Sequence, residues 1–95
     1  MTGIRTIGVI GAGQMGNGIA HVCALAGFDV LLNDVSAERL EAGLKTIQRN
    51  MYRQVHRQVI TKDQRDAAVK RIKAAKSLAD FADVDIALEA YQALK

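Results

Sequence analysis

The chain has 95 residues, 49% of them hydrophobic, with a formal net charge of +3 and one cysteine. This length suits a single domain with one core and excludes a second domain. The lone Cys23 excludes an internal disulfide framework, and no Cys or His spacing matches a zinc site, so we expect a reducing, cytoplasmic environment. No apolar run approaches the length of a membrane span, and we expect no membrane partner.

The chain first predicts a strand and then a helix. Residues 6–10 are apolar on both faces and are followed by glycine, as in a buried strand of a parallel sheet. Over residues 14–26, apolar residues recur at helical spacing, so we expect them to form one face of a helix; they are Met15, Ile19, Val22 and Ala26.

A glycine and a serine mark the boundaries of the next elements. Gly27 supplies a stop for the first helix, and residues 28–34 predict a second strand. Ser36 stands where a helix N-cap is expected. Apolar residues at steps of four and three then indicate a long amphipathic helix over residues 36–59, with a stripe of Leu40, Leu44, Ile47, Met51 and Val55.

The remaining residues predict a second helix and further strands. Thr61 offers another N-cap, so we expect a helical hairpin over about residues 36–76. The apolar stripe expected on its second helix is Ala68, Ile72 and Ala75. A strand is expected at 84–88, preceded by a short extended piece near 74–78.

Gly11, Gly13 and Gly16 form the pattern G-x-G-x-x-G between the first strand and the first helix. The pattern alone is common, but here Asp34 also follows Gly11 by 23 residues at the end of the next strand, as in a dinucleotide-binding site. The glycines permit a tight turn, close approach to a pyrophosphate and close helix packing, while bare amides at the helix start bind phosphate oxygens.

Asp34 selects the cofactor in this interpretation. Its carboxylate can accept both ribose hydroxyls of an adenosine and would repel a 2′-phosphate, which favours NAD over NADP, although the nearby Arg39 weakens that preference. The alternative is that the glycines only form a turn and Asp34 only ends a strand. The elements indicate an α/β fold over residues 1–95, a partial Rossmann-type parallel sheet of about four strands with the hairpin inserted after the second strand.

These residues resemble the amino-terminal part of the 3-hydroxyacyl-CoA dehydrogenase family, and most closely its bacterial 3-hydroxybutyryl-CoA members. The likeness is carried by TIGVIGAGQMGNGIAHVCALAGFDVLLND, by the long helical insertion after it and by DVDIALEA. The resemblance implies an NAD-dependent oxidation of a (3S)-3-hydroxyacyl-CoA, or the reverse, in fatty-acid or butyrate metabolism.

The resemblance also implies a cofactor-binding set. The residues that would line the pyrophosphate are Gly11, Ala12, Gly13, Gln14, Met15 and Gly16. Asp34 would bind the adenosine ribose, and Glu89 with Ala90 would lie near the cofactor beyond the last strand. Family members usually carry a further glutamate three residues after that Glu-Ala pair, where this chain reads YQALK.

No catalytic residue is expected in this chain. In the family, the catalytic His–Glu pair with its Ser and Asn partners comes from sequence beyond this length, so we expect a partial domain that binds cofactor without turnover alone. Neither His21 nor His56 is placed to serve as a general base, and both are interpreted as surface histidines. Cys23 is interpreted as a small buried hydrophobe.

Eleven of the thirteen Lys and Arg residues lie between Arg39 and Lys76. Within that segment a line of cations recurs at every fourth residue, and its members are Lys45, Arg49, Arg53 and Arg57. The resemblance implies that Arg49, Arg53 and Arg57 approach the phosphates of an acyl-CoA substrate. The alternative is a solvated face, and without interleaved aromatic residues we do not expect nucleic-acid binding.

A different class of function is a non-catalytic module that binds a dinucleotide and associates with other copies. Half of a dinucleotide-binding fold has exposed sheet edges, which are ready to pair with another strand. We therefore expect a homo-oligomer through those edges, and mass in solution distinguishes the alternatives.

Overall fold

The computed structural model describes residues 3–89. Its elements are β1 (Thr6–Ile10), α1 (Gln14–Leu25), β2 (Asp29–Asn33), α2 (Ala37–His56), α3 (Lys62–Arg71), β3 (Ile72–Ala74), the 3-10 helix η1 (Leu78–Asp83) and β4 (Ile86–Glu89). The four strands form one parallel sheet in the order β3-β2-β1-β4. This confirms the α/β class, the parallel sheet and the helical hairpin, α2 with α3, after the second strand.

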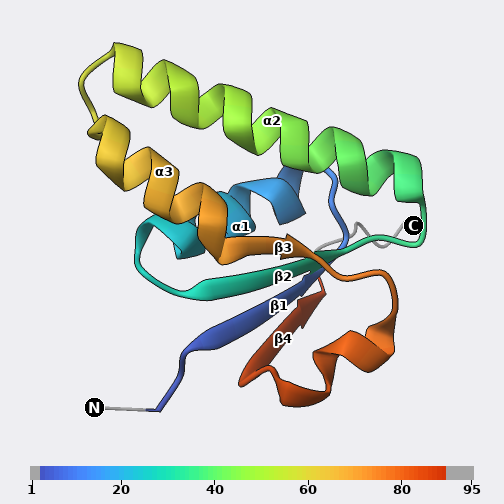
Figure 1. The fold of residues 1–95 in the computed structure, drawn as a ribbon. Coiled ribbons are helices and arrows are strands. Elements are labelled where there is room, and N and C mark those ends of the chain that lie inside the picture. The colour runs from blue at the N-terminus through green and yellow to red at the C-terminus, as the bar shows by residue number, and fades with distance from the viewer. Residues whose placement is uncertain (1–2, 90–95) are drawn as a thin grey trace.

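The three α-helices lie together on one face of the sheet, and η1 lies on the other (Figure 1). Side chains alternate along a strand, so every second residue of β1 and β2 faces the helices. The buried residues that meet there include Ile7, Val9, Val30 and Leu32 from the strands and Leu40, Ile47 and Met51 from α2. Most of the apolar stripe predicted for the long helix is therefore confirmed as its core face, with Leu44 packed partly against the core, whereas Val55 near the end of the helix is only partly buried.

The opposite face of β1 is closed by η1. Gly8 is buried, and a Cβ atom there would lie 2.5 Å from the Phe81 ring. Glycine at this position therefore lets the ring of Phe81 lie against the strand backbone. Any other residue at position 8 would have a Cβ atom that displaces the ring.

The helix boundaries follow the predicted caps. The Ser36 hydroxyl accepts a hydrogen bond from the N–H of Arg39, and Thr61 forms a reciprocal capping box with Gln64. Gly27, with φ at 107°, ends α1 as expected. The long helix is shorter than expected, because it begins at residue 37 and ends at residue 56 instead of 59.

The buried face predicted for α1 is wrong. Met15 is 56% exposed, Val22 is 67% exposed and Ala26 is also exposed, although Ile19 packs partly against the core. The residues that α1 buries are instead the small ones, Gly16, Ala20 and Ala24. Small side chains let the helix lie close to the sheet. The distance between helix and sheet depends on tertiary packing, which the spacing of apolar residues along the sequence does not indicate.

The second helix is also shorter than predicted. It ends at Arg71, and Ile72 opens β3 by pairing with Val30 of β2, so the predicted stripe retains only Ala68 within the helix. The expected extended piece near 74–78 is displaced, because the strand covers residues 72–74. Ile72 is β-branched and lies beside the edge of β2, so pairing with that strand is more favourable than continuing the helix.

Candidate functional site

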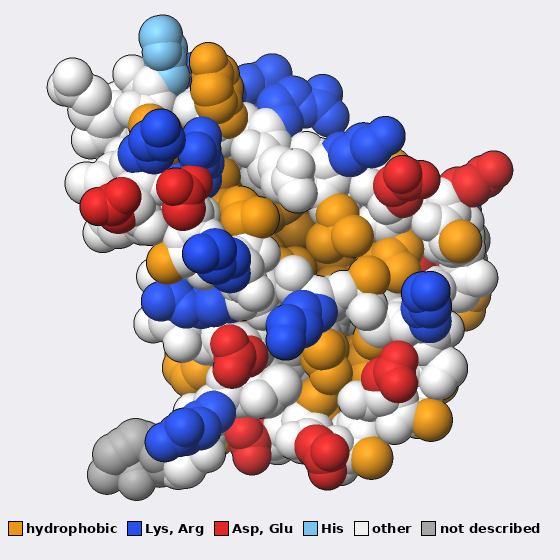
Figure 2. Space-filling model, in the orientation of Figure 1, with side chains coloured by type: hydrophobic (Ala, Val, Ile, Leu, Met, Phe, Trp, Pro, Cys, Tyr) orange, Lys and Arg blue, Asp and Glu red, His pale blue; other side chains and the backbone are white. Residues whose placement is uncertain are grey.

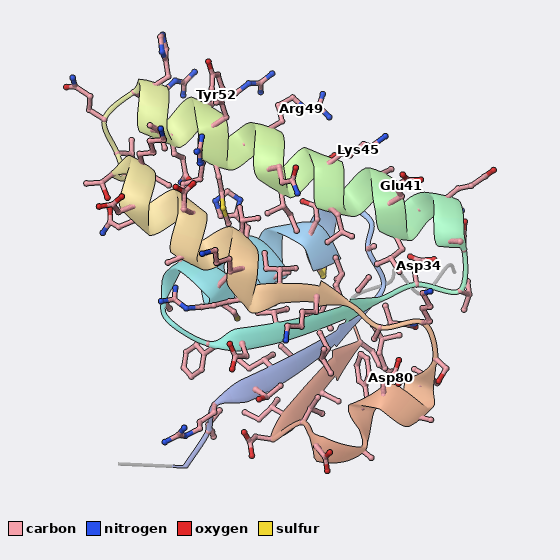
Figure 3. All side chains as sticks on the ribbon, in the orientation of Figure 1. Asp34, Glu41, Lys45, Arg49, Tyr52 and Asp80 are labelled. Carbon is pink, nitrogen blue, oxygen red and sulfur yellow. The ribbon has the colours of Figure 1, made fainter. Side chains whose placement is uncertain are left out.

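The predicted site residues gather where the parallel strands end. The register places Ile10 of β1 level with Asn33 of β2 and with Glu89 of β4. Gly11 and Asp34 follow these strand ends directly, and Figure 3 shows Asp34 at that edge of the sheet. Ala90, the last predicted member, lies outside the described residues.

The glycine-rich loop, residues 11–16, has the predicted backbone features. Gly11 has φ at 106°, a conformation that suits a tight turn, and its N–H donates to the carbonyl of Asn33 at 2.7 Å, which links this turn to the end of β2. Gly13 is the N-cap of α1, with no side-chain cap there, and a Cβ at Gly13 would meet nothing within 4 Å. The first N–H groups of α1 lack intrahelical partners, so this open corner suits an anion.

The other loop residues divide between exposed and buried positions. Gln14 and Met15 are exposed in the first turn of α1, whereas Gly16 is buried beneath it. Ala12 is only 3% exposed, so it contributes backbone and not side-chain surface. Of the predicted pyrophosphate residues, Gly13, Gln14 and Met15 are therefore exposed, whereas Gly11, Ala12 and Gly16 are buried.

The Asp34 carboxylate is held by backbone donors. Its Oδ2 accepts from the N–H of Ala12 at 2.8 Å and its Oδ1 accepts from the N–H of Ser36 at 2.9 Å. Burial raises the pKa of Asp34, but these donors and the Arg39 charge outweigh it and hold the pKa below its ordinary value. Each carboxylate oxygen has a second lone pair, so ribose hydroxyls can still donate to it.

A groove of about 520 Å³ is lined by both the glycine-rich loop and α2. Its lining residues are Ala12, Gly13, Gln14, Asn17, Arg39, Ala42, Gly43, Thr46 and Asn50. The sequence did not single out Asn17, Thr46 or Asn50. The spacing of Thr46 and Asn50 by four residues, on the side of α2 next to its apolar stripe, is the signal that could have identified them.

The cation line lies on the solvent side of α2. Lys45 and Arg49 point away from the sheet in Figure 3, and Figure 2 shows basic side chains spaced along the rim that α2 forms. Lys45 forms an ion pair with Glu41 at 3.9 Å, with both side chains 72% exposed. Among the described residues, no ion pair involves Arg49, Arg53 or Arg57.

The two histidines differ in their surroundings. His56 is exposed as expected, but His21 is half-buried, and its Nε2 lies 2.7 Å from Oε1 of Gln54 on α2. His21 is therefore less exposed than expected and contacts α2. Cys23 is partly buried, which raises the pKa of its thiol and fits the packing role predicted for it. Within residues 3–89, no group of acidic, His or Cys side chains could hold a metal ion, and no helix is long and apolar enough to cross a membrane.

Known proteins are similar to this chain in both sequence and fold. The family model described as "3-hydroxyacyl-CoA dehydrogenase, NAD binding domain" matches residues 6–92. The 3-hydroxybutyryl-CoA dehydrogenase of Bradyrhizobium diazoefficiens is 59% identical over 86 residues, which cover 90% of this chain and 29% of that protein. A probable 3-hydroxybutyryl-CoA dehydrogenase of Bacillus subtilis is 39% identical over 87 residues, 92% of this chain and 30% of the relative.

Solved structures of related dehydrogenases have a similar fold. The (S)-3-hydroxybutyryl-CoA dehydrogenase of Ralstonia eutropha has a TM-score of 0.91 and 36% identity, over 97% of this chain and 32% of the other. The 3-hydroxybutyryl-CoA dehydrogenase of Escherichia coli K12 also has a TM-score of 0.91, with 33% identity, over 97% of this chain and 20% of that one. The chain thus spans less than a third of each of these relatives.

Proposed function

Because the chain belongs to the family of NAD-binding domains of 3-hydroxyacyl-CoA dehydrogenases, we propose that it is the NAD-binding part of an oxidoreductase acting on 3-hydroxyacyl-CoA. NAD, when bound, supplies the acceptor for a hydride from the substrate's secondary alcohol. The names of the relatives make 3-hydroxybutyryl-CoA the first substrate to test. The observation that carries the proposal is the open corner at Gly13 beside the Asp34 carboxylate.

The residues at this corner fit a dinucleotide. Gly13 leaves free the space that a Cβ would fill, and the uncapped start of α1 offers N–H donors to a diphosphate. Asp34, whose lowered pKa keeps it charged, would accept hydrogen bonds from the adenosine ribose. Glu89, at the end of the neighbouring strand β4, would flank the cofactor, and Ala90, the next residue in the sequence, is proposed to do so on the family resemblance alone.

Oxidation of a secondary alcohol also needs a general base near the hydroxyl. His21 is engaged with Gln54 between α1 and α2, and His56 is at the far end of the hairpin. We therefore assign no catalytic residue within residues 3–89. The role of this chain is to bind and orient the cofactor, and the base comes from elsewhere in the enzyme.

We propose the cation line as the contact with the substrate. Arg49, Arg53 and Arg57 are exposed and have no ion-pair partner among the described residues, so they can meet the phosphates of an acyl-CoA. Lys45 contributes less, because Glu41 already partly balances its charge. Nucleic acid is not proposed as a partner, because Tyr52 is the one aromatic residue among these cations, whereas successive bases need successive aromatic side chains to stack on.

Location and assembly are proposed on separate grounds. A cytoplasmic location fits the single free Cys23, although a rice relative is named as peroxisomal. Self-association through β4 is proposed because only one side of that strand pairs with β1, and Ile86 and Leu88 are each 37% exposed. Light scattering at micromolar concentrations tests it, and a strictly monomeric mass would reject it. The relatives favour the dehydrogenase interpretation over a non-catalytic, self-associating module.

Two experiments test the proposed function. Calorimetric titration of the 95-residue chain with NAD should show binding that is weaker for NADP, because Asp34 opposes a 2′-phosphate. For activity, residues 6–92 replace the matching part of the Bradyrhizobium relative, and the chimera is assayed with 3-hydroxybutyryl-CoA and NAD. No NAD binding by the chain, or a folded but inactive chimera, would remove the support for the proposal.

A further inference from the structure

Gly43 is the one glycine outside the first 27 residues, and it lies within α2. Glycine inside a helix is less favourable than alanine, because it costs more backbone entropy and packs no side chain. The pattern of the helix gives no reason for it, since the residues on both sides are ordinary helix formers. Its reason is in the contact that α2 makes.

The backbone of α2 at Gly43 lies directly on the glycine-rich loop. A Cβ at this position would be 2.6 Å from the carbonyl oxygen of Ala12 and 3.0 Å from its Cβ. Real Cβ atoms do not approach backbone oxygens so closely, so either the helix or the loop would have to move. Gly18 of α1 is the contrast, because a Cβ there would meet nothing within 4 Å.

Ala12 has little freedom to move aside. It is 3% exposed, and its N–H donates to Asp34 at 2.8 Å. Its neighbour Gly11 is tied in turn to the carbonyl of Asn33 at 2.7 Å. A displacement of Ala12 would therefore strain both anchors and shift Gly13, which is next in the chain.

We propose that Gly43 is a positioning residue for cofactor binding, which lets α2 lie against the Ala12 carbonyl and so sets the backbone of the loop that receives the NAD diphosphate. This rests on the proposed function, because it takes the glycine-rich loop as the diphosphate site. Gly43 lines the same groove as Gly13 without being assigned to the cofactor. A site of this kind loses affinity when its backbone moves by about half an ångström.

The test is a titration of Gly43→Ala with NAD, ADP and adenosine at a temperature where circular dichroism shows the variant fully folded. NAD and ADP should bind about tenfold more weakly than to the wild type, and adenosine should lose less than about threefold. Gly18→Ala is the matched control, with the same added methyl in a helix and no contact, and should bind all three ligands as the wild type does.

The outcomes separate the two proposals. If the wild type does not bind NAD, the proposed function fails. If the wild type binds and Gly43→Ala binds equally well, or loses adenosine and ADP by the same factor, the positioning role fails. If Gly43→Ala does not fold, the same methyl group is added in an Ala12→Gly background. Ala12→Gly removes the Cβ contact of residue 12, while the contact with its carbonyl oxygen remains, so Ala12→Gly is compared with Ala12→Gly/Gly43→Ala. Equal NAD affinity of these two proteins would also overturn the role.

Discussion

The backbone N–H of Ala12 donates to the carboxylate of Asp34 at 2.8 Å, which joins the loop after β1 to the end of β2. The second carboxylate oxygen accepts from Ser36 at 2.9 Å, just before α2. One side chain therefore connects two loops that are far apart in the sequence. Asp34 is part of the scaffold of the site as well as a candidate ligand of the ribose.

Replacing Asp34 should consequently affect both stability and binding. Asp34→Ala leaves the N–H groups of Ala12 and Ser36 without their acceptor, which should lower the free energy of unfolding by about 1–2 kcal/mol. NAD affinity should fall by at least about tenfold. Asp34→Asn retains one acceptor oxygen and should be intermediate in stability. Urea unfolding and NAD titration measure the two effects, and equal stability of all three proteins would contradict the scaffold role.

The same carboxylate should make stability depend on pH. The folded pKa of Asp34 is lowered, so its contribution is present above the ordinary aspartate pKa and is lost as the pH falls through the lower folded value. The stability difference between the wild type and Asp34→Asn should thus be constant near pH 6 and shrink below about pH 4. Asp66 and Asp85 also have lowered pKa values, but they are common to both proteins and cancel in the difference. A difference that grows on acidification would refute this assignment.

Local sequence signals predicted the β1-α1-β2 unit and its site because each signal acts within a few residues. Gly11 and Gly27 both have positive φ where turns were expected, and Ser36 and Thr61 cap helices where the pattern placed them. The position of Asp34 at the strand edge was also predictable, since parallel strands end together.

What the sequence did not reveal depends on distances between elements. The buried side of α1 is made of Ala20 and Ala24, not of Met15 and Val22, because the helix lies close to the sheet. Ile72 fits a helical stripe and still forms a strand, because β2 has an open edge beside it. No local rule connects position 43 to the glycine-rich loop, so that contact became visible only in the fold.

Gly13→Ala should separate binding from stability. A methyl group at this position meets nothing within 4 Å and Gly13 already has φ at −70°, so only the poorer N-cap propensity of alanine should lower the free energy of unfolding, by less than about 1 kcal/mol. The methyl would stand where a diphosphate approaches the backbone, so NAD affinity should fall by about tenfold or more. Unfolding and NAD titration are measured side by side. Unchanged affinity would mean that the diphosphate does not lie against this residue.

Gly8→Ala, in contrast, should lower the free energy of unfolding. The added methyl would lie 2.5 Å from the Phe81 ring, which must turn away from β1 at a cost of about 1–3 kcal/mol in stability. In a Phe81→Leu background the same substitution should cost less, because a smaller side chain yields more easily. A double-mutant cycle by urea unfolding measures this coupling. Additive effects would mean that the ring does not press on the strand.

The cation line yields the test that separates a substrate contact from a solvated face. Coenzyme A titrated into the chain should bind more weakly as salt is raised, because exposed charges are screened. Arg49→Glu/Arg53→Glu should weaken binding about tenfold, since each reversal replaces an attraction to phosphate by a repulsion. Lys73→Glu, exposed on β3, is the control for charge alone and should have little effect. If Lys73→Glu weakened binding as much for each charge reversed, the arginines would be a solvated face and not a phosphate site.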